Sequence, residues 1–182
     1  RRLESLLRRY TLPVRSIDEF DKLPIPFRAV ATDLETGAAV VLDRGDLSAA
    51  LRSSMSVPGV FSPIDVDGRV LGDGGLVNNV PIDVARAMGV DVVIVVNVGT
   101  PLAGRNSLSS ALGVTTQMIN ILTEQNVQRS LATMGERDVL VAPQLGTLTA
   151  GDFERSAELI MLGERGAQAA LARLQPLARS AD

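Results

Sequence analysis

The run at residues 90–98 (VDVVIVVNV) constrains the fold of this chain more than any other segment. It is rich in β-branched residues and almost continuously apolar, which is typical of a strand buried on both faces of a parallel sheet. Helical patterns flank it at residues 81–88 and 108–134, and a further short strand is expected at 139–142. Alternating strands and helices favour a layered α/β/α fold with a largely parallel central sheet.

Two hairpins are expected ahead of this run, at residues 27–42 and 64–71. The first has Glu35-Thr36-Gly37 between two β-prone segments, which is a hairpin signal. The second is joined by Asp67-Gly68, a pair that tolerates the positive φ angles of tight hairpin turns.

Two helix starts carry capping residues. Asp46 is placed to cap a helix that continues to about Ser54, because its carboxylate can accept from the unpaired amides of the first turn. Thr149 and Asp152 form a candidate capping box for a last helix that continues to about residue 174.

Composition narrows the class of protein. With 182 residues, of which 46% are hydrophobic and 21% charged, the chain is expected to form a single globular domain over residues 1–182. The net charge is −3, and the 18 basic residues form no evident basic patch along the sequence. No nucleic-acid partner is therefore predicted. The absence of cysteine excludes disulfides and thiol catalysis but leaves the compartment open, cytoplasmic or exported.

The sequence indicates neither a membrane span nor a signal peptide. The most apolar stretch is far shorter than the ~20 residues of a membrane helix. The first residues have a helical pattern without an initiator methionine or an apolar signal-peptide core. We therefore expect the chain to begin inside a longer protein.

The segment Gly72-Asp73-Gly74-Gly75 is the main candidate for chemistry. The chain contains no histidine, the usual proton carrier at neutral pH, so hydrolytic chemistry would have to use a carboxylate. Glycines on both sides would let another backbone or a substrate approach Asp73 closely. The alternative is an ordinary turn, since Asp and Gly are common turn residues.

Other motifs favour structural roles. Asp33 is interpreted as a turn cap, and the Asp65-x-Asp67-Gly68 segment as a hairpin turn, because the remaining ligands of a calcium loop are missing. The glycines do not form the G-x-G-x-x-G pattern, and Lys22 is the only lysine, so phosphate binding has little support. No cofactor and no metal ion are predicted.

Taken together, several segments resemble the C-terminal half of the bacterial patatin-like phospholipases. They are SSMSVPGVFSPI, the following Asp-Gly turn, and LGDGGLVNNVPIDVARAMGVDVVIVVNVG, with PFRAVATDLETG before and TQMINILTEQNVQRSL after them. The resemblance covers residues 24–143, and its most specific part is the Asp-Gly-Gly followed by Asn-x-Pro. It implies a patatin-like α/β domain that is incomplete at the N-terminus.

The resemblance also implies an activity, that of a serine acyl hydrolase with a Ser-Asp dyad acting on phospholipids or other fatty-acyl esters. Asp73 corresponds to the dyad aspartate and Gly74 and Gly75 to the glycines behind it, while Asn79 and Pro81 match the start of the next helix. In this mechanism the carboxylate takes the serine proton and later activates water.

The loop at residues 56–63 is a candidate wall of the acyl site, or else a rigid surface connection. Its candidate pocket residues are Ser56, Pro58, Val60 and Phe61. The expected partners are the lipid substrate and, transiently, a membrane surface, with a second copy of the chain as a further candidate.

The nucleophile of such an enzyme is missing from this sequence. No serine lies in a Gly-x-Ser-x-Gly motif, and no second glycine-rich run could supply oxyanion amides. We therefore expect this chain to carry the base and to be inactive alone. The alternative is a non-catalytic α/β binding or assembly module whose Asp-Gly-Gly segment is structural; a nucleotide-binding domain is a third reading, and we predict no stabilisation by nucleotides.

Overall fold

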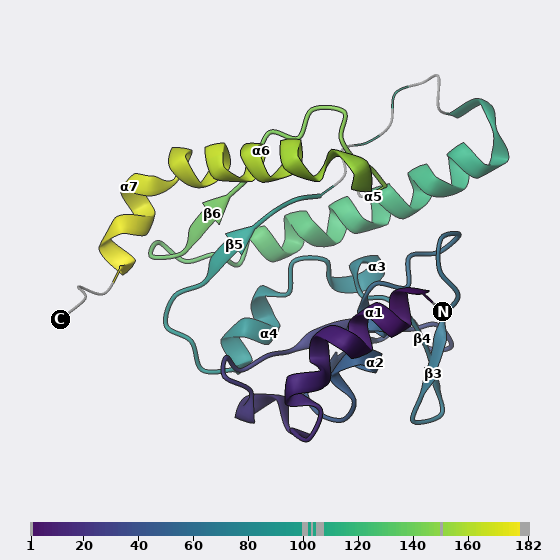
Figure 1. Ribbon diagram of the computed structural model, residues 1–182. Helices are drawn as coiled ribbons and strands as arrows, with labels where there is room; N and C mark the ends of the chain where they lie inside the picture. The colour runs from purple at the N-terminus through teal and green to yellow at the C-terminus, as the bar shows by residue number, and fades with distance from the viewer. Residues whose placement is uncertain (1, 100–101, 103, 105–107, 150, 179–182) are drawn as a thin grey trace. The chain divides into compact units, whose positions relative to one another are not determined.

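The computed structural model describes residues 2–99, 102, 104, 108–149 and 151–178 of the chain. The Cα positions group into two compact units, Arg1–Val84 and Ala85–Asp182, coloured from purple to teal and from teal to yellow in Figure 1. Each unit has its own sheet.

The sheet of the first unit has four strands in the order β2-β1-β4-β3, and every neighbouring pair is antiparallel. The strands are β1 (Ala29–Asp33), β2 (Ala39–Leu42), β3 (Ile64–Val66) and β4 (Arg69–Asp73). Both predicted hairpins are confirmed, β1 with β2 and β3 with β4. Asp67 and Gly68 take φ angles of 53° and 75° at the second turn, as the sequence predicted.

Helices accompany this sheet. They are α1 (Arg2–Thr11), α2 (Leu47–Ser54), α3 (Gly75–Asn78) and α4 (Ile82–Ala87), which contains the boundary between the units, with the 3₁₀ helices η1 (Leu12–Val14) and η2 (Phe20–Lys22). The predicted cap of α2 is confirmed, since the Asp46 side chain accepts from the Ala49 N–H at 3.0 Å. Helix α2 contacts α1 as well as β1 and β4. The core beside it contains the buried Phe20, Ala29 and Ala50.

The second unit contains one parallel pair of strands and a set of helices. The elements are β5 (Ile94–Val96), α5 (Ala111–Leu131), β6 (Val139–Val141), η4 (Phe153–Arg155), α6 (Ser156–Ala169), α7 (Leu171–Leu174) and η5 (Gln175–Leu177). β5 and β6 pair in parallel, and α6 contacts β6. In the described part of the chain, no helix combines the length and the apolar character that crossing a bilayer requires.

The prediction of a largely parallel central sheet is wrong, although the mixed α/β character is confirmed. The four-stranded sheet is antiparallel throughout, and only β5 and β6 run parallel. The physical reason lies in the connections. Tight turns such as Asp67-Gly68 can join only antiparallel neighbours, because parallel strands need a long crossover.

The run at residues 90–98 is also less buried than predicted. Only Ile94–Val96 form a strand; Val95 is 4% exposed, whereas Ile94 and Val96 are 51% and 57% exposed. Because alternate residues of a strand point to opposite faces, one face of β5 is covered within the described residues and the other is open. The open face lines an apolar hollow of about 570 Å³ between the β5–β6 pair and α6.

The start of the last helix follows the prediction only in part. The Thr149 N–H and hydroxyl both donate to the Asp152 carboxylate, at 2.7 and 2.8 Å. A 3₁₀ turn then comes first, and the α-helix begins at Ser156 and ends at Ala169, before the short α7. The Thr149–Asp152 pair therefore closes the turn ahead of η4 and does not cap α6.

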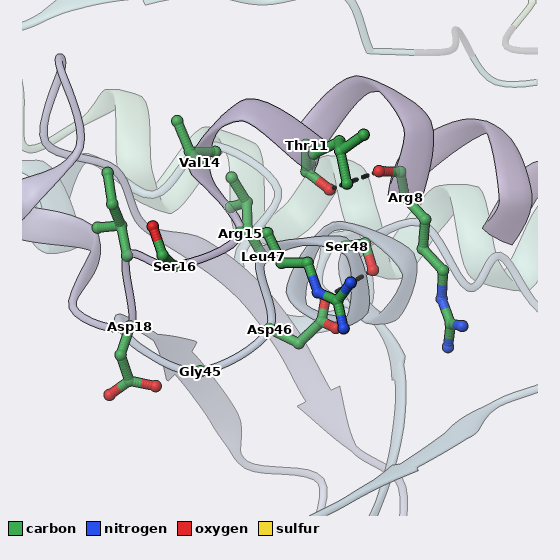
Figure 2. Close-up of a pocket in the computed structure, with 12 residues that line it drawn as sticks. Arg8, Thr11, Val14, Arg15, Ser16, Asp18, Gly45, Asp46, Leu47 and Ser48 are labelled. Carbon is green, nitrogen blue, oxygen red and sulfur yellow. Dashed lines mark hydrogen bonds between the residues drawn. The ribbon is translucent and has the colours of Figure 1, made fainter.

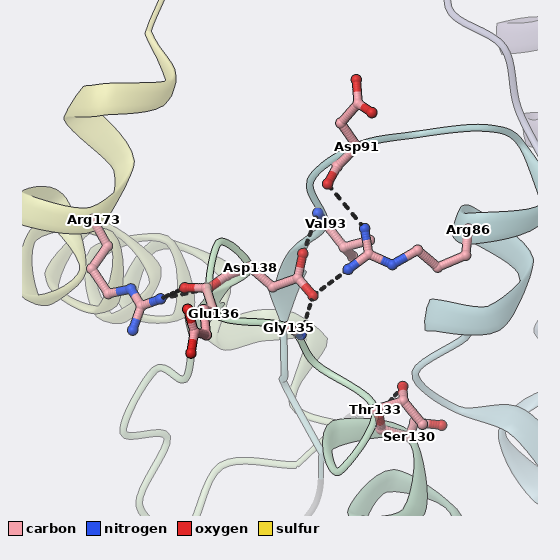
Figure 3. A network of polar contacts seen from close by, with 9 residues as sticks. All are labelled: Arg86, Asp91, Val93, Ser130, Thr133, Gly135, Glu136, Asp138 and Arg173. Carbon is pink, nitrogen blue, oxygen red and sulfur yellow. Dashed lines mark hydrogen bonds and ion pairs between the residues drawn. The ribbon is translucent and has the colours of Figure 1, made fainter.

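A buried carboxylate, Asp138, joins several segments of the second unit (Figure 3). It accepts from the N–H groups of Val93 and Gly135, at 2.8 and 2.7 Å, and from the Arg86 guanidinium. The backbone N–H donors, Val93 first, together with Arg86, lower the pKa of Asp138 to about 2. Arg173 donates to the carbonyls of Glu136 and Asp138, at 2.6 and 2.9 Å. This network fixes the start of both parallel strands.

Candidate functional site

Asp73 is the last residue of β4, the strand that lies between β1 and β3. Its N–H donates to the Ser56 carbonyl at 3.1 Å, and its carbonyl accepts from the Thr32 hydroxyl at 2.7 Å. In the β1–β4 pair it stands opposite Ala31. Hydrogen bonds therefore hold both the N–H and the carbonyl group of Asp73. They fix the position of its Cα atom and thus the point from which its side chain extends.

The Asp73 carboxylate is half-buried and accepts one short hydrogen bond, from the Gly75 N–H to Oδ1 at 2.6 Å. Burial raises the pKa of this carboxyl group above its ordinary value, and the Gly75 N–H opposes the rise only in part. A carboxylate with a raised pKa is a stronger base than a free aspartate. The environment of Asp73 thus moves it toward the proton affinity that a general base needs.

Position 74 needs a glycine because the backbone of β1 lies very close to it. A Cβ atom at this position would lie 2.1 Å from the Val30 oxygen and 2.6 Å from the Val30 carbonyl carbon, both in the backbone of β1. Its φ angle of −66° is ordinary, so the need for glycine comes from space and not from conformation. Gly74 precedes α3, which shows that the Asp-Gly-Gly segment is a strand-to-helix junction and not a simple hairpin turn.

Gly75 leaves room beside the carboxylate. A Cβ atom here would lie 2.6 Å from the Asn79 Oδ1 and 2.9 Å from the Asp73 Oδ1. Any larger residue would displace the Asp73 side chain or the Asn79 side chain. Both glycines of the motif therefore serve the position and accessibility of Asp73.

An open cavity of about 500 Å³ lies beside Asp73 within the first unit. Its lining comes from α1, β1, α2 and the Asp-Gly-Gly segment, and it includes Leu7, Phe27, Val30, Leu51, Met55, Asp73, Gly74, Gly75, Asn78, Asn79 and Pro81. Aliphatic side chains and Phe27 provide the apolar part of the lining, while Asp73, the two asparagines, Arg28 and Ser54 provide the polar part. Such a cavity can hold an apolar chain with a polar group placed at Asp73.

The structure places the candidate pocket residues of the 56–63 loop outside this cavity. Ser56 is buried, and only its carbonyl meets Asp73. Its hydroxyl accepts from Arg52 Nη1 at 2.5 Å and donates to the Arg52 carbonyl at 2.9 Å. Pro58 and Val60 are exposed. The role of these loop residues in an acyl site stays a prediction.

Arg52 is a structural residue that sequence reasoning missed. Its guanidinium lies 5.0 Å from the centroid of the Phe61 ring and donates to the Ser62 carbonyl at 3.0 Å. Such cation–π contacts are stronger when the cation is desolvated, and Arg52 is buried. The contacts of Arg52 thus hold the loop at residues 56–63 against α2. The four-residue spacing from Arg52 to Ser56 at the end of a helix is the signal that could have indicated this contact.

Two acidic residues have the structural roles that the sequence indicated. The Asp33 Oδ1 accepts from the N–H groups of Glu35 and Thr36, as a turn cap. The Asp65 Oδ1 accepts from the Gly68 N–H at 3.1 Å, within the hairpin turn. Among the residues that the structure describes, no three acidic side chains gather as ligands for a metal ion.

Comparison with known proteins gives matches to part of the chain. A family model described as patatin-like phospholipase matches residues 2–86. Uncharacterized NTE family proteins of Mycobacterium tuberculosis and Mycobacterium bovis are 44% identical over 84 residues, which are 46% of this chain and 23% of theirs. Patatin-like phospholipase domain-containing protein 7 of Mus musculus is 42% identical over 84 residues, 45% of this chain and 6% of its own length. The chain thus spans less than a quarter of these relatives.

Proposed function

We propose that Asp73 is the general base of a Ser-Asp dyad in a lipid acyl hydrolase, because residues 2–86 match the family model described as patatin-like phospholipase. The observation that carries this proposal is the half-buried Asp73 carboxylate, held through Oδ1 by the Gly75 N–H and open to the adjoining cavity. Its substrates are fatty-acyl esters of glycerolipids, and the reaction is of the phospholipase A or lysophospholipase type.

The dyad is completed by a serine from a part of the full-length protein that precedes this segment. The serine hydroxyl attacks the ester carbonyl carbon while its proton passes to the Asp73 carboxylate. Asp73 then returns the proton to the leaving alcohol as the ester C–O bond breaks, which leaves an acyl-serine. Water attacks this ester, gives a proton to Asp73 and releases the fatty acid, and the proton returns to the serine.

The surroundings of Asp73 suit these steps. The Gly75 N–H holds Oδ1, so Oδ2 is the oxygen that receives the proton. Partial burial raises the pKa of the carboxyl group, which favours proton transfer from a hydroxyl. The apolar side of the cavity, with Leu7, Leu51 and Met55, would hold the acyl chain.

The test is the hydrolysis of a p-nitrophenyl fatty-acyl ester by the full-length protein that contains this chain. A positioned base contributes roughly 10² to 10⁴ in rate, so Asp73→Asn should lower kcat by that factor. Asp67→Asn is the matched control, because it makes the same chemical change at an exposed turn with a φ of 53°, where asparagine is well tolerated. Equal activity of both variants would refute the proposed role of Asp73.

A non-catalytic α/β binding or assembly module is the second candidate function. It is favoured by one observation, namely that this chain contains no Gly-x-Ser-x-Gly serine. A full-length protein without such a serine, and without ester hydrolysis, would support this alternative over the acyl hydrolase.

A further inference from the structure

We propose that the outer side of α1 is a surface that adsorbs to anionic lipid bilayers. Basic residues are concentrated in the N-terminal segment that contains this helix. The first fifteen residues contain five arginines and one glutamate, a net charge of +4, whereas the whole chain carries −3. The basic residues are therefore less scattered than the sequence analysis assumed, and the surface around α1 differs in charge from the rest of the chain.

Helix α1 has a wider apolar stripe than its contact with the protein requires. Leu3 and Leu7 are half-buried on the side that packs toward α2. Leu6 and Tyr10, four residues apart, lie next to them and are 47% and 75% exposed. At 3.6 residues per turn, two residues four apart lie along one side of a helix.

Arginines border the strip. Arg2 lies one turn before Leu6 on the same side, and the helical spacing places Arg9 next to it. Among the described residues, neither Arg2 nor Arg9 forms an ion pair with a carboxylate. A helix with apolar and aromatic residues beside free arginines is typical of a segment that lies in the interface of a bilayer.

A second group of arginines faces a different feature and is left out of the proposed surface. Arg8 and Arg15 line a hollow of about 460 Å³ beside the start of α2 (Figure 2). Asp18 and Asp46 line the same hollow, so both signs of charge are present there. This balance disfavours an anion site in the hollow and places the lipid contact on the outer side of α1.

The choice of a lipid surface over a protein partner rests on the proposed function, because the substrate of an acyl hydrolase is held in a bilayer. The position of α1 agrees with this choice, since Leu7, on its inner side, lines the cavity beside Asp73. Adsorption through Leu6 and Tyr10 would therefore bring that cavity to the lipid interface.

Tyr10 provides a direct test, because it is the only tyrosine and the chain has no tryptophan. The intrinsic fluorescence of the 182-residue chain should be quenched by vesicles of brominated phosphatidylcholine that contain phosphatidylglycerol. Vesicles without phosphatidylglycerol should quench it far less, and high salt should release the chain from the anionic vesicles.

Charge variants separate this surface from others. Each basic residue near an anionic membrane contributes roughly a fivefold change in partitioning. The double variant Arg2→Glu, Arg9→Glu should therefore bind at least roughly twentyfold more weakly in vesicle co-sedimentation. The double variant with lysine at both positions should bind as the original chain does. Arg69→Glu, on the β3–β4 hairpin, is the matched control and should leave binding unchanged.

Apolar variants test the other half of the surface. Leu6→Ser should weaken binding severalfold, because one buried leucine contributes to interfacial adsorption. Ile25→Ser, at another exposed apolar position in the same unit, should not. Circular dichroism spectra equal to that of the original chain would show that these exposed substitutions preserve the fold.

Several outcomes would overturn the proposal. These are no binding to anionic vesicles, equal binding to neutral ones, binding that persists in the Arg2 and Arg9 variant, or a dimer in sedimentation equilibrium that Leu6→Ser dissociates. The last would assign the surface to a second copy of the chain. Asp73→Asn should bind vesicles normally, so a failure of membrane binding can be told apart from a failure of the proposed dyad.

Discussion

Replacing Gly74 by alanine tests the view that the Asp-Gly-Gly segment is held by a close backbone contact. The added Cβ would lie 2.1 Å from the Val30 oxygen, well inside the distance at which carbon and oxygen atoms repel each other. Neither partner is a flexible side chain, so β1 and β4 would have to move apart by about 1 Å in a tightly packed interior. Overpacking of this kind costs about 3 kcal/mol or more.

The matched control is Gly68→Ala, in the β3–β4 turn. Gly68 has a φ angle of 75°, and a Cβ atom there would have no atom beyond the adjacent residues within 4 Å, so alanine suffers only backbone strain of about 1 to 2 kcal/mol. The assay is urea unfolding of the 182-residue chain, followed by far-ultraviolet circular dichroism. If Gly74→Ala loses less unfolding free energy than Gly68→Ala, the inferred contact between Gly74 and β1 is incorrect.

Three further predictions follow from named contacts. Because burial raises the pKa of Asp73 above its ordinary 3.8, its charged form destabilises the fold once the pH exceeds that value; Asp73→Asn should raise Tm at pH 7, and the gain should vanish below pH 3.8. The pKa of Asp138 is lowered from 3.8 to about 2, so its stabilising effect is complete above pH 3.8 and is lost as the pH falls toward 2. Asp138→Asn should lower Tm by about 5 °C or more at pH 7 and make Tm depend less on pH between pH 3.8 and 2. Arg52→Met should loosen the 56–63 loop, which limited proteolysis would detect as faster cleavage than in an Arg44→Met control; equal cleavage rates would contradict the anchoring role of Arg52.

The parts of the fold that depend on residues close together in the sequence could be predicted from the sequence. Asp46 caps α2, and Asp67-Gly68 forms the second hairpin turn, because each feature needs only a few consecutive residues. The direction of the main sheet and the burial of residues 90–98 could not be predicted in the same way. They depend on which strands become neighbours, and a continuous apolar run does not specify how many neighbours it has.

The candidate site shows the same division. Asp73 and its glycines stand out in the sequence because of their composition, but the reason for Gly74 is the backbone of Val30, which belongs to a distant strand. Thr32 was missed altogether. Its hydroxyl reaches the Asp73 carbonyl only because β1 and β4 pair in one register, and register is a property of the assembled sheet.

The most direct test of the proposed dyad is the intact mass of the protein after treatment with a fluorophosphonate, which reacts with activated serines. The full-length protein should gain one adduct, the 182-residue chain should gain none, and Asp73→Asn in the full-length protein should react far more slowly than the Asp67→Asn control. An adduct on the 182-residue chain alone, or equal labelling of the two variants, would contradict the account of Asp73 as a base for a serine outside this segment.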